Sequence, residues 1–104
     1  MILERVREAA LKRLLFLPHA ITQMSRPDRM IATDEVRAVI AKGIVIEDYP
    51  EDKRGHSCLM LGIGETGRAI HVACAPKDEY LAIITAYLPS GSEWNFDYKE
   101  RKQK

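Results

Sequence analysis

The sequence lacks the features that mark membrane, secreted and disulfide-rich proteins. Its longest strongly apolar stretch covers residues 81–88, whereas a helix that crosses a bilayer needs about 20 apolar residues. Charged residues interrupt the N-terminus from Glu4 to Glu8, so no signal-peptide pattern is present. Only two cysteines occur, Cys58 and Cys74, and they do not form a Cys-x-x-Cys pair. We therefore expect a cytoplasmic protein in which both cysteines are reduced core residues.

The sequence also lacks an excess of charge of either sign. It has 16 Lys and Arg against 15 Asp and Glu, which gives a formal net charge of +1 at pH 7. This balance excludes a wholly basic nucleic-acid binder. Residues 1–30 carry six basic and three acidic side chains, residues 97–104 carry four and two, and the middle of the chain is acidic. A confined basic patch would form if the two ends met in space.

The 104 residues, of which 46% are hydrophobic, are enough for a single domain (1–104) with one core. Apolar residues recur at three-to-four spacing from Ile2 to Leu17, which predicts an N-terminal amphipathic helix over residues 1–16. This helix should end before Pro18, because proline disfavours helical geometry in the residue before it. Pro18 suits the first turn of a second, short helix that extends to about Met24.

A third helix is predicted from Asp34 to Lys42, with Thr33 as its N-cap and Gly43 in a left-handed position after it. Beyond Gly43 the apolar pattern changes to alternation or continuous runs, which predicts strands over residues 44–49, 57–63, 69–75 and 80–88. The expected fold is α+β, with the N-terminal helices packed on one face of a four-stranded antiparallel sheet.

Three glycines have the spacing of a dinucleotide-binding loop. Gly62, Gly64 and Gly67 spell Gly-x-Gly-x-x-Gly after a predicted strand, but a second strand follows them instead of the helix that holds a pyrophosphate. We therefore interpret them as glycines with positive φ in a β-hairpin.

Two histidines are candidates for chemistry. His19 lies in the first turn of the second helix and shares its polar face with Gln23 and Arg26. A helix N-terminus disfavours imidazolium, so His19 would be a neutral base; the alternative is that it bridges the helix junction. His71 lies mid-strand and faces the side of small neighbours, Ala69 and Ala73. The alternative for His71 is a hydrogen-bonded core histidine. The three histidines lack metal-ligand spacing, so no metal or other cofactor is expected.

The C-terminus combines aromatic and basic residues. Trp94, Phe96 and Tyr98 alternate and are followed by Lys99 and Arg101, a pattern suited to stacking unpaired bases and contacting phosphates. The alternative is an edge strand that packs Trp94 onto the sheet and ends in a solvated tail.

Several runs, in this order and spacing, resemble the bacterial domain-of-unknown-function family 4258. They are Pro18-His19-Ala20-Ile21, residues 43–50, Arg68-Ala69-Ile70-His71-Val72, residues 83–89, and finally Trp94 and Arg101. The resemblance covers residues 17–102, and it departs from the family at Gln23, where an arginine is usual. It implies a toxin-type protein of MqsR/RelE-like ribonuclease layout, encoded beside a zinc-binding MqsA-like antitoxin as partner.

The first hypothesis is a metal-independent endoribonuclease of a toxin–antitoxin pair, with RNA as substrate. Such an enzyme needs a base, an acid and cations around the phosphorane. The catalytic candidates are His19, His71 and Tyr87. Tyr87 shares the face of His71 if odd residues of the last two strands pair, with His71 near Thr85. The substrate-binding candidates are Arg26, Arg29, Arg68, Trp94, Lys99 and Arg101.

The second hypothesis is a non-catalytic module that binds a protein or RNA through the same surface. It predicts that structural hydrogen bonds occupy the histidine face. Gln23 favours this hypothesis, because the loss of a cation weakens a phosphate site.

Overall fold

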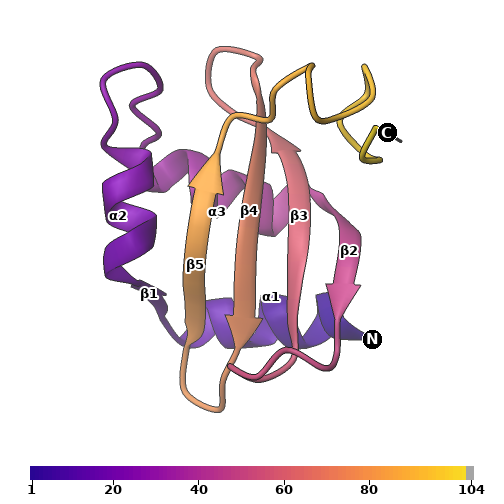
Figure 1. Cartoon of the computed structure of the whole chain (residues 1–104). Coiled ribbons are helices and arrows are strands. Elements are labelled where there is room, and N and C mark those ends of the chain that lie inside the picture. The colour runs from indigo at the N-terminus through magenta and orange to yellow at the C-terminus, as the bar shows by residue number, and fades with distance from the viewer. Residues whose placement is uncertain (103–104) are drawn as a thin grey trace.

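The computed structural model describes residues 1–102, which form three helices and a five-stranded mixed sheet (Figure 1). Lys104, the end of the predicted basic tail, lies outside the described residues. The predicted α+β class is confirmed. The elements, in chain order, are α1 (Ile2–Lys12), β1 (Leu14–Phe16), α2 (Pro18–Met24), α3 (Thr33–Lys42), β2 (Ile44–Tyr49), β3 (Ser57–Ile63), β4 (Ala69–Pro76) and β5 (Leu81–Tyr87).

The sheet has one strand more than the sequence predicts. Its order is β1-β5-β4-β3-β2; the last four strands pair antiparallel as expected, whereas β1 pairs parallel to β5, with Leu14 opposite Leu81. The prediction of a four-stranded antiparallel sheet is therefore wrong. The N-terminal helix ends at Lys12 instead of reaching residue 16, because Arg13 is extended and its carbonyl accepts a hydrogen bond from the Leu81 amide.

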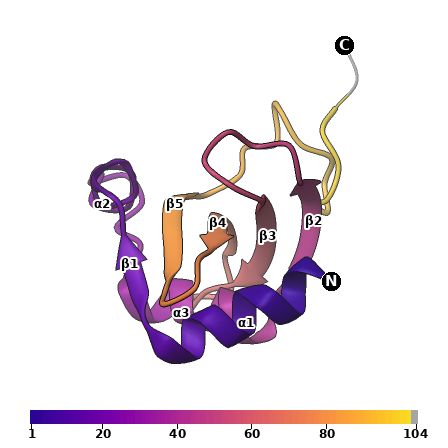
Figure 2. The same ribbon diagram turned by 90° about the horizontal axis from the view of Figure 1, so that it is seen from below.

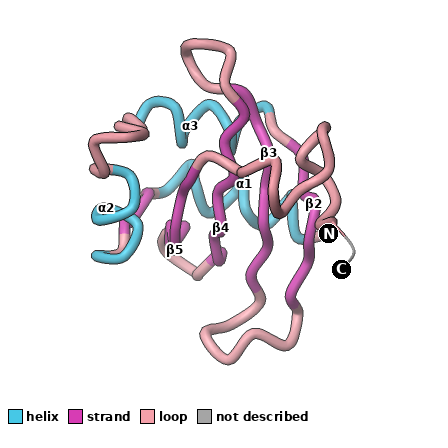
Figure 3. Tube along the Cα trace, turned by 45° about the horizontal axis from the view of Figure 1, so that its top comes forward, coloured by secondary structure: helices cyan, strands magenta, loops and turns pink. Residues whose placement is uncertain are grey.

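Helices cover only one face of the sheet. Figure 2 shows α1 and α3 beneath the sheet and α2 beside its β1 edge, while the β2–β3 loop and the C-terminal segment, residues 89–102, lie on the other side. We call this second side the helix-free face. The β3–β4 turn and the β2–β3 loop project from opposite ends of the sheet (Figure 3).

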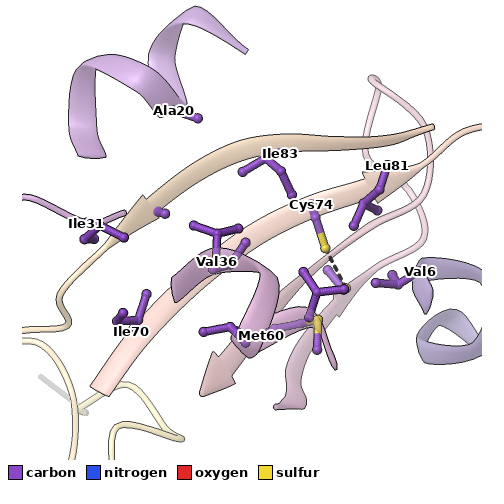
Figure 4. Close-up of a cluster of buried hydrophobic side chains, with 14 of the residues drawn as sticks. Val6, Ala20, Ile31, Val36, Met60, Ile70, Cys74, Leu81 and Ile83 are labelled. Atoms are coloured by element: carbon purple, nitrogen blue, oxygen red, sulfur yellow. Dashed lines mark hydrogen bonds between the residues drawn. The ribbon is translucent and has the colours of Figure 1, made fainter. Parts of the chain in front are cut away.

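The core lies mainly between the sheet and the helices α1 and α3 (Figure 4). Val6 of α1 and Val36 of α3 are fully buried against Met60 and Cys74 of the sheet. Cys58 and Cys74 are directly opposite on β3 and β4, and both are buried free thiols, with 3.9 Å between their sulfur atoms. Their predicted place in the core is confirmed.

The ends of α3 differ from the predicted caps. Ala32 is the N-cap, and its amide donates to the Glu35 carboxylate at 3.1 Å, so Thr33 is already in the first helical turn. Gly43 is extended, with φ of −78°, and does not adopt the predicted left-handed conformation. Glycine is required there because a Cβ atom would lie 2.5 Å from the carbonyl oxygens of both Val39 and Leu61.

The three spaced glycines serve two purposes. Gly67 has φ of +79° in the β3–β4 turn, as predicted, whereas Gly62 and Gly64 do not have positive φ. A Cβ atom on Gly62 would lie 2.9 Å from the Cα atom of Val39, and one on Gly64 would collide with the Glu35 carboxylate. These two glycines therefore let α3 cross close to the sheet, which the turn interpretation does not explain.

The two basic ends do not form one groove. The helix α1 lies on the helix-covered face and the C-terminal segment, residues 89–102, on the helix-free face (Figure 2). Arg7 of α1 donates to the carbonyl oxygens of Ile40 and Gly43 at 3.0 Å each, which ties its charge to the helix layer. Within residues 1–102, no helix is long and apolar enough to cross a membrane.

Candidate functional site

Strand pairing brings together two of the three predicted catalytic residues. His71 on β4 and Tyr87 on β5 are direct cross-strand partners on the helix-free face. The His71 Nδ1 atom lies 3.2 Å from the Tyr87 hydroxyl, and the two rings meet edge to face with 5.3 Å between their centroids. His71 lies opposite Tyr87 and Ala73 opposite Thr85, so odd residues pair at this end of the two strands, which is the register that places His71 and Tyr87 on one face.

The C-terminal segment covers this pair. Trp94 is 3% exposed and packs edge to face on His71, with 4.4 Å between ring centroids. The backbone oxygen of Tyr98 lies 2.8 Å from His71 Nε2. His71 is therefore completely buried, and both of its ring nitrogens are engaged. Phe96, in contrast, is 94% exposed, so it is the aromatic residue of this segment that faces solvent most fully.

An ion pair holds the segment against the neighbouring strand. Arg101 donates two hydrogen bonds to the Glu47 carboxylate of β2, at 2.9 and 3.1 Å, and its guanidinium carbon lies 4.6 Å from the centre of the Trp94 ring. Burial raises the pKa of Glu47, but the Arg101 guanidinium and the Tyr49 hydroxyl outweigh burial and lower it. The site therefore holds a carboxylate paired with a cation beside the histidine.

Burial sets the protonation of the central pair. It lowers the pKa of His71, because a charged imidazolium loses its hydration there, and it raises the pKa of Tyr87 for the same reason. At neutral pH both groups are uncharged. A neutral imidazole can accept a proton and a phenol can donate one, so the pair can pass a proton between them.

A second cluster contains two of the predicted cations. Arg68 pairs with the buried Glu35 at 2.9 Å and also donates to the backbone oxygens of Arg29 and Met30, at 2.5 and 3.0 Å. The Arg29 side chain donates to Gln23 at 3.2 Å, and its buried Nε has no hydrogen-bond partner. The Arg68 guanidinium thus ties the α2–α3 loop to the sheet, and its donors are used within the protein.

The remaining candidates are exposed and dispersed. His19 lies on α2, beside the β1 edge, and Arg26 follows that helix and pairs with Asp28 at 3.4 Å. Lys99 lies on the C-terminal segment. Of these three residues, only Lys99 lies on the same segment as Trp94 and Tyr98. The helix α2 and the C-terminal segment lie on opposite sides of the molecule in Figure 1.

Sequence reasoning missed two groups that complete the site. Glu47 lies on the helix-free face because a bulge between Val45 and Glu47 shifts the register of β2, and such a bulge has no signal in the alternating pattern. The other group is the Tyr98 carbonyl, and a backbone atom carries no residue-type signal. In the part of the chain that the structure describes, no three His, Cys, Asp or Glu side chains gather as metal ligands.

The fold and this site define a small α+β protein with a histidine–tyrosine pair on the helix-free face of its sheet. Residues 16–88 match the family described as Domain of unknown function (DUF4258), and the protein belongs to that family. The match includes His71 and Tyr87 but ends before Trp94 and Arg101, which the sequence resemblance includes. No curated protein and no solved structure matches the chain.

Proposed function

We propose that the protein is a metal-independent endoribonuclease of toxin type that acts on RNA in the cytoplasm. The observation that carries this proposal is the hydrogen bond between Tyr87 and His71, formed across two strands on the face that no helix covers. In this proposal Tyr87, which is half-buried, contacts the RNA, and His71 lies behind it. A zinc-binding MqsA-like antitoxin is the partner that the toxin interpretation proposes.

The reaction is a transfer at phosphorus. The Tyr87 oxygen takes the proton of a ribose 2′-hydroxyl as its own proton passes to His71 Nδ1. The 2′-oxygen bonds to phosphorus, the bond from phosphorus to the 5′-oxygen breaks, and that oxygen takes a proton from water. The hydroxide that remains takes the proton of Tyr87 as His71 returns its own to the Tyr87 oxygen, which restores the neutral pair. The products are a 2′,3′-cyclic phosphate and a 5′-hydroxyl. Lys99, on the segment that carries Trp94, supplies positive charge where charge builds up on the phosphate oxygens. The Arg101 guanidinium is bound to Glu47 and holds that segment in place.

His19 has no step in this scheme: it is exposed on α2, whereas the groups that hydrogen-bond or pack on His71 come from β5 and the C-terminal segment. Arg68 has none either, because its guanidinium is used by Glu35 and two carbonyls. His19 and Arg68 are both predicted as site residues from the sequence. The proposed reaction uses neither of them.

The test is cleavage of a single-stranded RNA in the presence of EDTA. We expect Tyr87→Phe to reduce cleavage by about 10²-fold or more, because a positioned proton-transfer group contributes roughly that much. Tyr80→Phe is the matched control: it removes the same hydroxyl just before β5 begins, at the opposite end of that strand, where Tyr80 lies near Arg13. Equal cleavage by both variants would contradict the assignment of Tyr87. RNA with 2′-deoxyribose at the cleaved position should remain intact.

One observation favours the second candidate, a non-catalytic module that binds RNA or protein. His71 is completely buried, and its two nitrogens are occupied within the protein, as a structural histidine requires. The module predicts that wild type leaves the RNA intact in the same assay and that its overproduction does not slow bacterial growth. The ribonuclease proposal predicts growth arrest, relieved by Tyr87→Phe.

A further inference from the structure

The hydrogen bonds of His71 define which nitrogen carries its proton. A backbone carbonyl oxygen can only accept a hydrogen bond, so the 2.8 Å contact with Tyr98 requires the hydrogen on Nε2. Burial keeps the imidazole neutral, so Nδ1 carries a lone pair and faces the Tyr87 hydroxyl at 3.2 Å. The hydroxyl of Tyr87 therefore donates and Nδ1 accepts.

The Tyr98 carbonyl is held by an unusual backbone conformation. Tyr98 has φ of +60°, in the left-handed region that residues with a side chain rarely adopt. Its amide donates to the Asn95 carbonyl at 2.8 Å, and the Asn95 amide donates to the Glu100 carbonyl at 2.9 Å. Trp94 and Arg101 close this loop with a β-bridge. The loop as a whole turns the Tyr98 oxygen toward the sheet.

Two contacts fix the loop on the helix-free face. Trp94 fills the space above His71, and Arg101 binds Glu47 of β2. The indole of Trp94 packs on His71, and the polar groups that face it are the Tyr87 phenol, the Tyr98 carbonyl and the Glu47–Arg101 ion pair. Of these, the carbonyl is the group that hydrogen-bonds Nε2.

We propose that Tyr98 is a positioning residue whose backbone carbonyl holds His71 as the Nε2-protonated tautomer and leaves Nδ1 to accept the proton of Tyr87. The catalytic meaning of this arrangement rests on the proposed ribonuclease function, but the tautomer does not. In the other tautomer, Nδ1 would donate to the Tyr87 oxygen, and the relay could not take a proton from RNA. An imidazole held in the wrong tautomer loses most of its activity as a base.

Part of the site lies outside the region that matches the family. His71 and Tyr87 lie within residues 16–88, whereas the carbonyl that orients them comes from residue 98. The C-terminal segment is thus a working part of the site in this chain.

The test compares two variants that both remove the Tyr98 side chain. Glycine adopts φ near +60° without strain, whereas a β-branched valine strongly disfavours it, so Tyr98→Gly keeps the carbonyl in place and Tyr98→Val displaces it. NMR of ¹⁵N-labelled histidine reports which ring nitrogen is protonated. We expect Nε2–H in wild type and in Tyr98→Gly, and a shift toward Nδ1–H in Tyr98→Val. Phe96→Ala is the control within the same segment and should keep Nε2–H.

The cleavage assay adds a second readout. Tyr98→Val should lower kcat by about tenfold or more with little change in KM, since a wrong tautomer costs up to about 10⁴-fold, and Tyr98→Gly should retain more of kcat than Tyr98→Val. Nδ1–H in wild type, or an unchanged tautomer in Tyr98→Val, would overturn the inference. If wild type fails to cleave RNA but shows the expected tautomers, the ribonuclease proposal is wrong and the positioning of His71 by Tyr98 holds.

Discussion

The carboxylate of Glu35 and the guanidinium of Arg68 form a largely buried ion pair, with 2.9 Å between Glu35 Oε1 and Arg68 Nη2, that joins α3 to the start of β4. Glu35 is 4% exposed and also accepts hydrogen bonds from the amides of Ala32 and Glu65. The pair therefore fixes the helix layer to the end of the sheet that carries the β3–β4 turn.

Loss of this pair should destabilise the protein. We expect Arg68→Met to lower the free energy of unfolding by about 2–3 kcal/mol, less than the roughly 3–5 kcal/mol of a fully buried pair, because Glu35 keeps its two amide donors. Urea denaturation measures the change. Arg26→Met removes the exposed pair with Asp28 and should change the same quantity by less than about 1 kcal/mol. Equal losses in the two variants would show that burial of the pair does not matter.

The same pair should make stability depend on acid pH. The hydrogen bond from Arg68 lowers the pKa of Glu35 below its ordinary value of 4.5 and outweighs burial, which raises it. A lowered pKa in the folded state gives stability that is complete above pH 4.5 and is lost as the pH falls through the lowered value. The Tm of wild type should therefore fall as the pH drops below 4.5. Glu35→Gln should flatten part of this dependence of Tm on pH. A variant curve parallel to that of wild type would argue against this carboxylate as a source.

The glycines of the β3–β4 region should respond differently to alanine. At Gly62 the new Cβ atom would lie 2.9 Å from Val39 Cα, and we expect an overpacking cost of about 1–3 kcal/mol. At Gly67 there is open space, so the cost of about 1–2 kcal/mol comes from the positive φ alone. Asparagine tolerates that conformation, so Gly67→Asn should recover stability relative to Gly67→Ala, while Gly62→Asn should not recover it relative to Gly62→Ala. Chemical denaturation of the four variants decides this.

Trp94 is the single tryptophan of the chain, and it reports on the C-terminal segment. Its burial against His71 predicts emission at short wavelength in wild type. Arg101→Gln removes both the ion pair with Glu47 and the charge over the indole ring, so emission should shift to longer wavelength as water reaches the ring. Lys102→Gln removes a neighbouring exposed charge and should leave the spectrum unchanged. Identical spectra in the two variants would mean that Arg101 does not hold the segment.

The sequence predicts most of the fold because its periodicity is strong where the elements are long. The strands β2 and β3 have the predicted bounds, β4 differs by one residue at its C-terminal end, and β5 differs by one residue at each end. The strand β1 was missed because the continuous apolar run from Leu14 to Leu17 fits a helical stripe and a short strand equally well. The choice between helix and strand depends on pairing with the free edge of β5, which is a tertiary contact that the local sequence does not show.

The site follows a similar division. Alternation along two strands places His71 and Tyr87 on one face only if odd residues pair, and the pairing of β4 with β5 has that register at this end of the strands. The contact between Tyr98 and His71 depends on a single left-handed residue, and the position of Glu47 depends on a bulge. Neither local conformation follows from residue type. The burial of Trp94 agrees with the structural alternative, in which this side chain packs onto the sheet.

The parallel pairing of β1 with β5 has a consequence for synthesis on the ribosome. Leu14 leaves the exit tunnel before its partner Leu81 and before the three strands β2, β3 and β4 have been made. Until then the edge of the sheet that β1 will form has no neighbour, and the apolar run of β1 stays exposed or is held in transient non-native contacts. Closing a loop of this length costs conformational entropy before any strand contact repays it. The first strand in the sequence is therefore among the last of the sheet to pair, and completion of the sheet awaits the synthesis of β5.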